Sequence, residues 1–321
     1  MISVAFSIVL VGALAVISVS SLDGSSAVVI EALYPKDLGN LFLRGSDCGL
    51  SWDNGIVMKR EQVSPAEYKY SLSVSCSIPT TPATKPLEVK VLIADKQWML
   101  GSNHFIPLSS ATNETTTQLF PWFFTYSGTL KTIAKVYSSE LGNYRDIIYY
   151  LPPSYNENTL KRYSNVLVMH DGQNLFNPKT SAFGTAWMCQ DTMDGLIIGG
   201  KSDEVLIAGA YNTNDRTNEY TYIYDPSEDA GGKGDLYLDW IESTLLPVTS
   251  QNFRVDIARE TLGILGSSLG GLLSCYAGWT RSGVYGRVGC MSSSFWWDSN
   301  DFQRNVQTSV SPVVAGQVLV L

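Results

Sequence analysis

The feature that most constrains the fold is a run that changes from strand to helix through a glycine–serine turn. Residues 262–265 are apolar, Gly266-x-Ser268-x-Gly270 follows, and apolar residues then recur at helical spacing to about residue 279. A serine on so tight a turn needs neighbours that lack side chains. Its hydroxyl then projects beyond the sheet, and the N–H of Leu269 lies at a helix N-terminus. The pattern predicts a nucleophilic Ser268 on a strand-to-helix elbow, with a turn used only for tight packing as the alternative.

The rest of the chain divides into two patterns. From residue 129 onward, strand-like runs (131–137, 144–151, 165–170, 204–210, 261–265 and 288–291) alternate with helical ones (186–198, 235–248 and 269–279). This alternation implies a mostly parallel sheet with helices on both faces. Before it, short alternating runs at 41–43, 69–74 and 87–94 predict strands, and 79–86 and 111–118 read as loops. We therefore expect a small antiparallel β-sandwich at 21–127 and an α/β domain at 128–321.

Composition and the first residues narrow the class of protein. The 321 residues carry 22 Lys plus Arg against 30 Asp plus Glu, a net charge of −8, and no basic run, which argues against nucleic acid as a partner. Residues 4–19 are almost wholly apolar and small residues follow, as in a secretory signal peptide (1–20). A buried first strand or a single anchor is the alternative. We expect a secreted or secretory-pathway protein with no membrane contact after signal removal, and Asn113-Glu114-Thr115 is a glycosylation sequon.

The five cysteines show no metal-binding spacing. They stand at 48, 76, 189, 275 and 290, without a CxxC pair or a Cys/His cluster, so no zinc or iron–sulfur site is expected. Cys48 and Cys76 both fall in the first third of the chain and could form a bridge within one domain. Buried free thiols are the equal alternative for all five.

A second turn motif precedes the elbow by roughly 100 residues. The predicted strand at 165–170 ends in His170-Asp171-Gly172-Gln173, where a loop after an early strand supplies an oxyanion N–H in α/β-hydrolases. Gly172 or Gln173 would be that donor, together with Leu269. We interpret His170 itself as a structural residue that holds the loop.

Four ordered motifs between residues 131 and 297 resemble one family. They are HDGQNLF (170–176), Asn212 with Arg216 and Glu219-Tyr220, GSSLGG (266–271) and SSSFWW (292–297). Together they are similar to the esterase family of α/β-hydrolases that includes esterase D, the feruloyl and acetyl-xylan esterases and the enterochelin esterases. The resemblance implies a serine carboxylic-ester hydrolase with Ser268 as nucleophile and an oxyanion hole made by Leu269 with Gly172 or Gln173. It also implies that Arg216, Glu219 and Trp296 lie in or near the substrate pocket; an internal Arg–Glu pair and a core tryptophan are the alternatives.

The N-terminal region resembles a second family. Residues 42–45 with 49–52, and 89–95 with Trp98, Gly101 and Asn103, are similar to starch-binding carbohydrate modules. The resemblance implies that Trp98, and less clearly Trp52, could stack on a sugar ring. One alternative is that either tryptophan packs inside the sandwich. Another is that the module serves in dimerisation or covers the substrate.

The sequence lacks the usual activating base after the nucleophile. In this fold the order is Ser, then Asp or Glu, then His, yet the only histidines, His104 and His170, precede Ser268. Residues 313–321 look like the strand that the family's acid follows, and Asp298 could stand in as an acid. We therefore expect a hydrolase domain that is incomplete at its C-terminus, as a fragment, an alternative product or a decayed gene. An intact enzyme with an unusual base is the less favoured alternative.

These features lead to one main interpretation and two others. The first is an exported serine esterase by descent that forms an acyl-enzyme on Ser268, with no metal or organic cofactor, whose own activity is doubtful without the histidine. The second is a secreted, non-catalytic carbohydrate-binding protein with a remnant hydrolase domain. The third, an acyltransferase, differs only in whether an alcohol replaces water. The sequence does not identify the acyl group, the alcohol, which could be carbohydrate-linked, or the oligomeric state.

Overall fold

A computed structural model describes residues 24–78, 85–108, 115–182, 184–309 and 316–320. The signal peptide and the Asn113 sequon expected from the sequence lie outside these residues, as does most of the 79–86 loop. Among the described residues, no helix is long and apolar enough to cross a bilayer.

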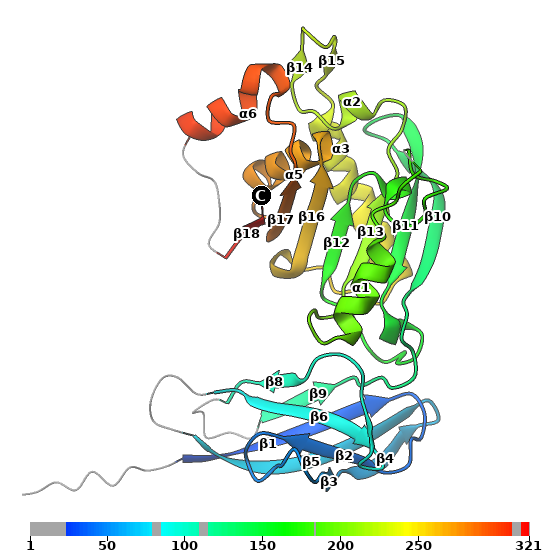
Figure 1. Cartoon of the computed structure of the whole chain (residues 1–321), viewed down its shortest axis with the longest axis vertical. Helices are drawn as coiled ribbons and strands as arrows, with labels where there is room; N and C mark the ends of the chain where they lie inside the picture. The colour runs from blue at the N-terminus through cyan, green and yellow to red at the C-terminus, as the bar shows by residue number, and fades with distance from the viewer. Residues whose placement is uncertain (1–23, 79–84, 109–114, 183, 310–315, 321) are drawn as a thin grey trace, which may run out of the picture.

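The N-terminal part consists of two sheets (Figure 1). The first has the strand order β4-β5-β1-β9 and the second has β3-β2-β6-β7, with β8 also paired to β6. Side chains alternate between buried and half-exposed along β2 and β6, as expected for strands with one face on a core. The strands are β1 (Gly24–Tyr34), β2 (Leu41–Gly45), β3 (Ile56–Val57), β4 (Lys59–Ser64), β5 (Glu67–Ile78), β6 (Leu87–Ile93), β7 (Gln97–Trp98), β8 (His104–Ile106) and β9 (Thr115–Leu119).

Strand β9 corrects two expectations. The sequence predicted a loop over 111–118, but Thr115–Leu119 is a strand. It pairs parallel to β1, with Thr115 opposite Val28, so the first sheet is not purely antiparallel as predicted. The threonine run is polar, which suggested a loop, yet threonine is β-branched and suits a strand when a partner edge is available.

The C-terminal part is built on one seven-stranded sheet with the order β10-β11-β13-β12-β16-β17-β18. β10 pairs antiparallel with β11, and β11 pairs antiparallel with β13. The remaining neighbours, β13-β12, β12-β16, β16-β17 and β17-β18, are all parallel pairs. The strands are β10 (Thr129–Ser138), β11 (Asn143–Leu151), β12 (Val166–Met169), β13 (Leu206–Ala210), β16 (Leu262–Ser267), β17 (Arg287–Met291) and β18 (Val318–Val320); β14 (Tyr224–Asp225) and β15 (Ala230–Gly231) form a separate hairpin. This is the mostly parallel sheet that the sequence predicted.

Helices cover both faces of this sheet. In Figure 1, α1 lies in front of it, and α3 and α5 lie behind. The helices are α1 (Cys189–Ile198), α2 (Arg216–Glu219), α3 (Gly234–Trp240), α4 (Leu246–Asn252), α5 (Leu269–Thr280) and α6 (Trp297–Thr308). A π-helical turn (Ile241–Leu245) joins α3 to α4 within the stretch that the sequence read as one helix. Helix α6 was not predicted.

The two parts share a continuous apolar core and a set of polar contacts. One buried cluster extends from the N-terminal sheets through Trp122 and Phe123 to residues of the large sheet and α1. The Glu157 carboxylate accepts hydrogen bonds from Tyr34 Oη at 2.8 Å and from the Phe123 N–H at 2.6 Å. Asn158 donates to the carbonyl of Leu33 at 2.9 Å. The apolar cluster and these hydrogen bonds fix the position of the N-terminal sheets against the large sheet.

Two disulfides cross-link the chain. Cys48 is bonded to Cys76 in the N-terminal part, the pairing that the sequence allowed. Cys275 in α5 is bonded to Cys290 in β17, which ties the helix after the elbow to the neighbouring strand. Among the described residues the remaining cysteine, Cys189, is a free thiol, and burial raises its pKa to about 11.

Candidate active site

Ser268 occupies a strained turn between β16 and α5. Its backbone has φ 56° and ψ −123°, a region that residues with a side chain rarely adopt. Its side chain is exposed, whereas the flanking Leu269 and Gly270 are buried. Its N–H donates to the carbonyl of Met291 on β17, at 3.1 Å, which holds the turn to the neighbouring strand. The hydroxyl is therefore presented to solvent at the carboxyl end of a central parallel strand.

The glycines of the elbow are required by a neighbouring histidine. A Cβ at Gly266 would lie 2.6 Å from His170 Cδ2 and 2.7 Å from the carbonyl carbon of Gly270. The His170 N–H also donates to the carbonyl of Leu265 at 3.1 Å. The turn at 170–173 is therefore packed directly against the elbow, as expected if both turns form one site.

Three backbone N–H groups of these two turns are unpaired within the described part of the chain. Among the residues that the structure describes, no group accepts a hydrogen bond from the N–H of Gly172, Gln173 or Leu269. A side chain at position 172 would overlap the carbonyl group of Gly209, so only glycine fits there. Leu269 is the first residue of α5, where the helix dipole favours negative charge.

Asp171 holds the turn at residues 170–173 in place. Its backbone has φ 56°, and its carboxylate accepts hydrogen bonds from Arg216 Nε at 2.7 Å and Nη2 at 2.8 Å and from Asn212 Nδ2 at 2.5 Å. Its N–H donates to Tyr220 Oη at 3.0 Å. Burial raises the pKa of Asp171, but the hydrogen bonds and charge of Arg216 outweigh burial and hold that pKa below its usual value. The sequence named Arg216 but missed Asp171, although the HDG turn contains it.

Ser294 is a further residue that the sequence did not single out. It is buried, and its Oγ lies 3.1 Å from Oγ of Ser268. Its N–H donates to the carbonyl of Ser268 at 3.0 Å. Trp296, two residues later, is 55% exposed, so it is a surface residue near the site rather than a core tryptophan.

Glu219 belongs to an ion pair inside the protein. It is fully buried, and its Oε1 lies 2.9 Å from Nη2 of Arg145, whose side chain is also fully buried. Asn143 and Thr213 donate to the same carboxylate. Glu219 is thus satisfied inside the protein, but the internal pair that the sequence allowed, Arg216 with Glu219, is not formed: Glu219 pairs with Arg145, and Arg216 pairs with Asp171.

Neither histidine makes a hydrogen bond to Ser268 among the described residues. His170 is buried, its Nδ1 lies 3.3 Å from Tyr237 Oη, and burial lowers its pKa to about 4. His104 belongs to β8 in the N-terminal part. Asp298, the alternative acid, is the second residue of α6, and its N–H donates to the Asp225 carboxylate at 2.9 Å. Among the described contacts, only Ser294 Oγ reaches the Ser268 hydroxyl.

Trp52 and Trp98 form a pair on the N-terminal sheets. Their ring centroids are 6.2 Å apart with an interplanar angle of 37°, and Trp98 is 39% exposed. The Arg44 guanidinium lies over the Trp98 ring, 5.2 Å from its centroid. Neither tryptophan belongs to the buried clusters of the described residues.

Comparison with known proteins assigns the family. The model of the family described as "Putative esterase" matches residues 138–316, more than half of the chain. The chain belongs to this esterase family. Membership agrees with the strand order of the large sheet and with the strand–serine–helix elbow of an α/β-hydrolase.

Individual relatives are more distant. The chain is 29% identical over 163 residues to the uncharacterized protein YbbA of Bacillus subtilis, covering 49% of this chain and 60% of that protein. It is 39% identical over 69 residues to the siderophore triacetylfusarinine C esterase of Aspergillus fumigatus, covering 21% of this chain and 23% of that protein. The chain thus spans less than two thirds of both curated relatives. Among solved structures, the IroE-like serine hydrolase of Shewanella oneidensis is 22% identical with a TM-score of 0.43, covering 56% of this chain and 55% of that one.

Proposed function

We propose that this esterase-family chain uses Ser268 as the nucleophile of carboxylic-ester hydrolysis. The observation that carries the proposal is the exposed serine at φ 56° between β16 and α5, beside N–H groups without partners among the described residues. A serine held at a cost in backbone energy indicates a functional rather than a packing role.

The reaction would proceed through an acyl-enzyme. Ser268 Oγ attacks the ester carbonyl carbon and gives its proton to a base, while the carbonyl oxygen becomes an oxyanion. The N–H of Leu269 and that of Gly172 or Gln173 donate to this oxygen. The C–O bond to the alcohol then breaks, and the alcohol leaves with the proton. Water attacks the acyl-enzyme in the same way and releases the acid and the free serine.

The residues of this sequence supply the nucleophile and the oxyanion hole, and we infer that they do not supply the base. His170 is buried with its Nδ1 3.3 Å from Tyr237 Oη, and His104 belongs to β8 in the N-terminal part. Loss of the histidine from a serine triad costs about a millionfold in kcat. We therefore expect the purified 321-residue chain to hydrolyse esters very slowly.

Exogenous imidazole provides the test. Hydrolysis of p-nitrophenyl acetate is measured with increasing imidazole for the wild type, Ser268→Ala and Ser292→Ala, a matched control on an exposed nearby serine. We expect an imidazole-dependent rate above the solution reaction for the wild type and Ser292→Ala, and the solution rate for Ser268→Ala. Equal rates for the wild type and Ser268→Ala at all imidazole concentrations would contradict the nucleophile. Fast wild-type turnover without imidazole would overturn only the inference about the base.

The substrate is proposed at the level of an ester. The name of the Aspergillus relative points to a siderophore ester, so triacetylfusarinine C belongs in the substrate panel beside feruloyl and acetyl sugar esters. Adding methanol distinguishes hydrolysis from acyl transfer, because a transferase would form the methyl ester.

A second candidate function is glycan binding by the Trp52–Trp98 pair. Two neighbouring indole rings with one exposed face can stack on sugar rings. Affinity electrophoresis in starch or xylan gels tests it, with Trp98→Ala expected to remove retardation. Trp296→Ala is the matched control, because Trp296 is also exposed but lies near Ser268. Retardation that survives Trp98→Ala would contradict the assignment.

We also propose that the protein matures in an oxidising compartment. The Cys48–Cys76 and Cys275–Cys290 disulfides support this, since such bonds persist mainly in secreted proteins. The test is to express the protein with and without secretion and to count its free thiols. The exported protein is expected to have one free thiol, that of Cys189.

A further inference from the structure

The loop that follows β17 brings a second serine to the candidate nucleophile. β17 lies beside β16 in the sheet, with Met291 opposite Ser267 (Figure 1). The Met291 carbonyl accepts the Ser268 N–H at 3.1 Å, and the Ser294 N–H donates to the Ser268 carbonyl at 3.0 Å. These two backbone hydrogen bonds attach the loop to the elbow through both polar groups of the Ser268 backbone. The position of Ser294 is therefore set by the same turn that presents Ser268.

The loop is packed closely enough to fix the Ser294 side chain. Ser292 has φ 42°, a left-handed backbone conformation that costs free energy in a residue with a side chain. A Cβ at Gly271, in the first turn of α5, would lie 2.6 Å from Ser293 Oγ and 2.8 Å from the Met291 carbonyl oxygen. The loop therefore lies directly against the helix backbone, and Ser294 is buried within this packing.

The Ser294 hydroxyl has a single hydrogen-bond partner within the described part of the chain. Its Oγ lies 3.1 Å from Ser268 Oγ, and no other described group makes a hydrogen bond to either oxygen. A buried hydroxyl is normally paired, because an unpaired one costs free energy. The nucleophile alone compensates for the burial of this hydroxyl.

The chemistry of the nucleophile decides which of the two hydroxyls donates. In the free protein either oxygen can donate, because both carry a proton. Once an acyl group is attached, Ser268 Oγ is the bridging oxygen of an ester and has no proton, so it can only accept. Ser294 is then the donor. It is the donor again when Ser268 Oγ carries negative charge as it leaves the acyl group.

We propose that Ser294 is a catalytic residue that donates a hydrogen bond to the departing Ser268 oxygen during hydrolysis of the acyl-enzyme. The inference rests on the proposed esterase function. In this step water bonds to the acyl carbon and gives a proton to a base, here added imidazole. The bond from that carbon to Ser268 Oγ breaks, and imidazolium returns the proton to Oγ. Ser294 keeps its own proton and stabilises the negative charge on the leaving oxygen.

The contribution of Ser294 should be larger in deacylation than in acylation. Only an interaction that is stronger in the transition state than before it accelerates a step. The bridging oxygen of an ester is a weak acceptor and an alkoxide-like oxygen is a strong one, so the Ser294 hydrogen bond strengthens as the C–O bond breaks. In acylation Ser268 Oγ begins as a hydroxyl, which already accepts well, and its charge passes to the carbonyl oxygen. The hydrogen bond therefore changes less in that step.

Intact-protein mass spectrometry measures the two steps separately. The 321-residue protein is acetylated with p-nitrophenyl acetate and imidazole and rapidly desalted, and loss of the acetyl group is then followed in fresh imidazole buffer. Ser294→Ala should gain the acetyl group at a rate within about 3-fold of the wild type and lose it roughly 10-fold or more slowly. Ser294→Thr keeps the hydroxyl and should lose the acetyl group at nearly the wild-type rate. Ser292→Ala is the matched control on an exposed serine of the same loop and should resemble the wild type in both steps.

Comparing the two steps distinguishes a catalytic role from a structural one. Both steps use the same oxyanion hole, so a variant whose elbow is merely displaced would slow both. Equal slowing of the two steps in Ser294→Ala, or an unchanged rate of deacetylation, would overturn the proposal and leave Ser268 as the nucleophile. No acetyl group on Ser268 of the wild type would overturn the proposed function and this inference with it. If Ser294→Thr fails to fold, the ratio of the two rates in Ser294→Ala decides the outcome.

Discussion

Replacing Glu219 with glutamine removes one charge from an ion pair that is closed off from solvent. Both the Glu219 and the Arg145 side chains are 0% exposed, with N···O distances of 2.9 and 3.1 Å. The Arg145 guanidinium also packs over the rings of Tyr237 and Trp240, at 5.0 and 4.6 Å from their centroids. In Glu219→Gln this cation stays buried among aromatic rings without its counter-charge.

The expected cost is large. Removing one partner of a buried pair destabilises proteins by about 3–5 kcal/mol, because the remaining charge is uncompensated. For a domain of 150–250 residues each kcal/mol lowers Tm by about 2–4 °C, so a loss of roughly 6–20 °C is expected. The amide keeps the size of the carboxylate, so the change does not include a cavity cost.

Differential scanning calorimetry and urea unfolding measure this effect. The control is Asp215→Asn, which breaks the exposed pair of Lys233 and Asp215, whose side chains are 46% and 36% exposed. Exposed pairs contribute about 0–1 kcal/mol, so the Tm of this control should change by no more than a few degrees. A Glu219→Gln protein as stable as the wild type would refute the structural role and return Glu219 to the candidate pocket residues.

Three further predictions concern the elbow, the histidines and a disulfide. Gly266→Ala places a Cβ against His170 and the backbone of Gly270, so we expect a less stable protein that has lost the imidazole-dependent esterase rate. Calorimetry measures the stability and p-nitrophenyl acetate hydrolysis measures the rate. A variant that is both active and stable would contradict the packing at the elbow. Burial lowers the pKa of His104 and of His170 from the ordinary 6.5 to about 4 in the folded protein. Between pH 6.5 and pH 4 the unfolded chain therefore binds more protons than the folded chain. The free energy of unfolding should fall over this range, by up to about 3 kcal/mol for each histidine. The double variant His104→Gln/His170→Gln should flatten this part of the urea-midpoint profile, and an unchanged slope would argue against buried neutral histidines. Cys275→Ala/Cys290→Ala opens a loop of 15 residues and should lower stability by about 3 kcal/mol in urea unfolding, whereas an unchanged midpoint would argue against the bond.

Local sequence signals predicted the parts of the fold that depend on local interactions. The elbow at Ser268 and the strands β12 and β16 were recognisable because apolar runs, glycines and a change of period are all short-range features. Strand β9 was missed because its pairing with β1 is set by residues about 87 positions away, as for Thr115 opposite Val28. A polar threonine run contains no local signal that the edge of a distant strand is available to pair with it.

The same distinction holds for the candidate site. Ser268, Leu269, Gly172 and Gln173 lie in short motifs whose spacing is fixed by the chain itself, so they can be proposed as site residues from the sequence alone. The role of Glu219 depends on Arg145, 74 residues earlier, and only the folded chain brings the two together.

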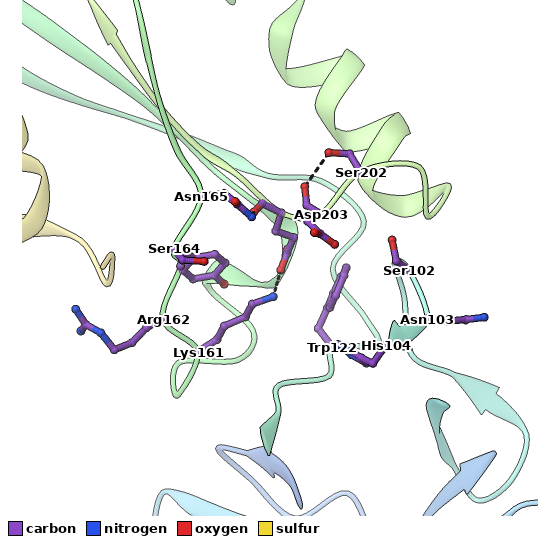
Figure 2. Close-up of a pocket in the computed structure, with 12 residues that line it drawn as sticks. Ser102, Asn103, His104, Trp122, Lys161, Arg162, Ser164, Asn165, Ser202 and Asp203 are labelled. Atoms are coloured by element: carbon purple, nitrogen blue, oxygen red, sulfur yellow. Dashed lines mark hydrogen bonds and ion pairs between the residues drawn. The ribbon is translucent and has the colours of Figure 1, made fainter. Parts of the chain in front are cut away.

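Contacts between the two parts were also beyond sequence reasoning. Trp122 and Glu204 both line a cavity between the two parts (Figure 2), although they come from segments far apart in the chain that no motif links. The contact between Ser294 and Ser268 likewise arises because β16 and β17 are neighbours in the sheet.

Mass spectrometry of the acylated protein tests the central claim most directly. The 321-residue chain is incubated with p-nitrophenyl acetate and imidazole, quenched in acid and digested, and the acetylated serine is located. The account predicts one acetyl group on Ser268, present in Ser292→Ala and missing from Ser268→Ala. Acetylation scattered over other residues, or unchanged in Ser268→Ala, would show that this hydroxyl is not the nucleophile.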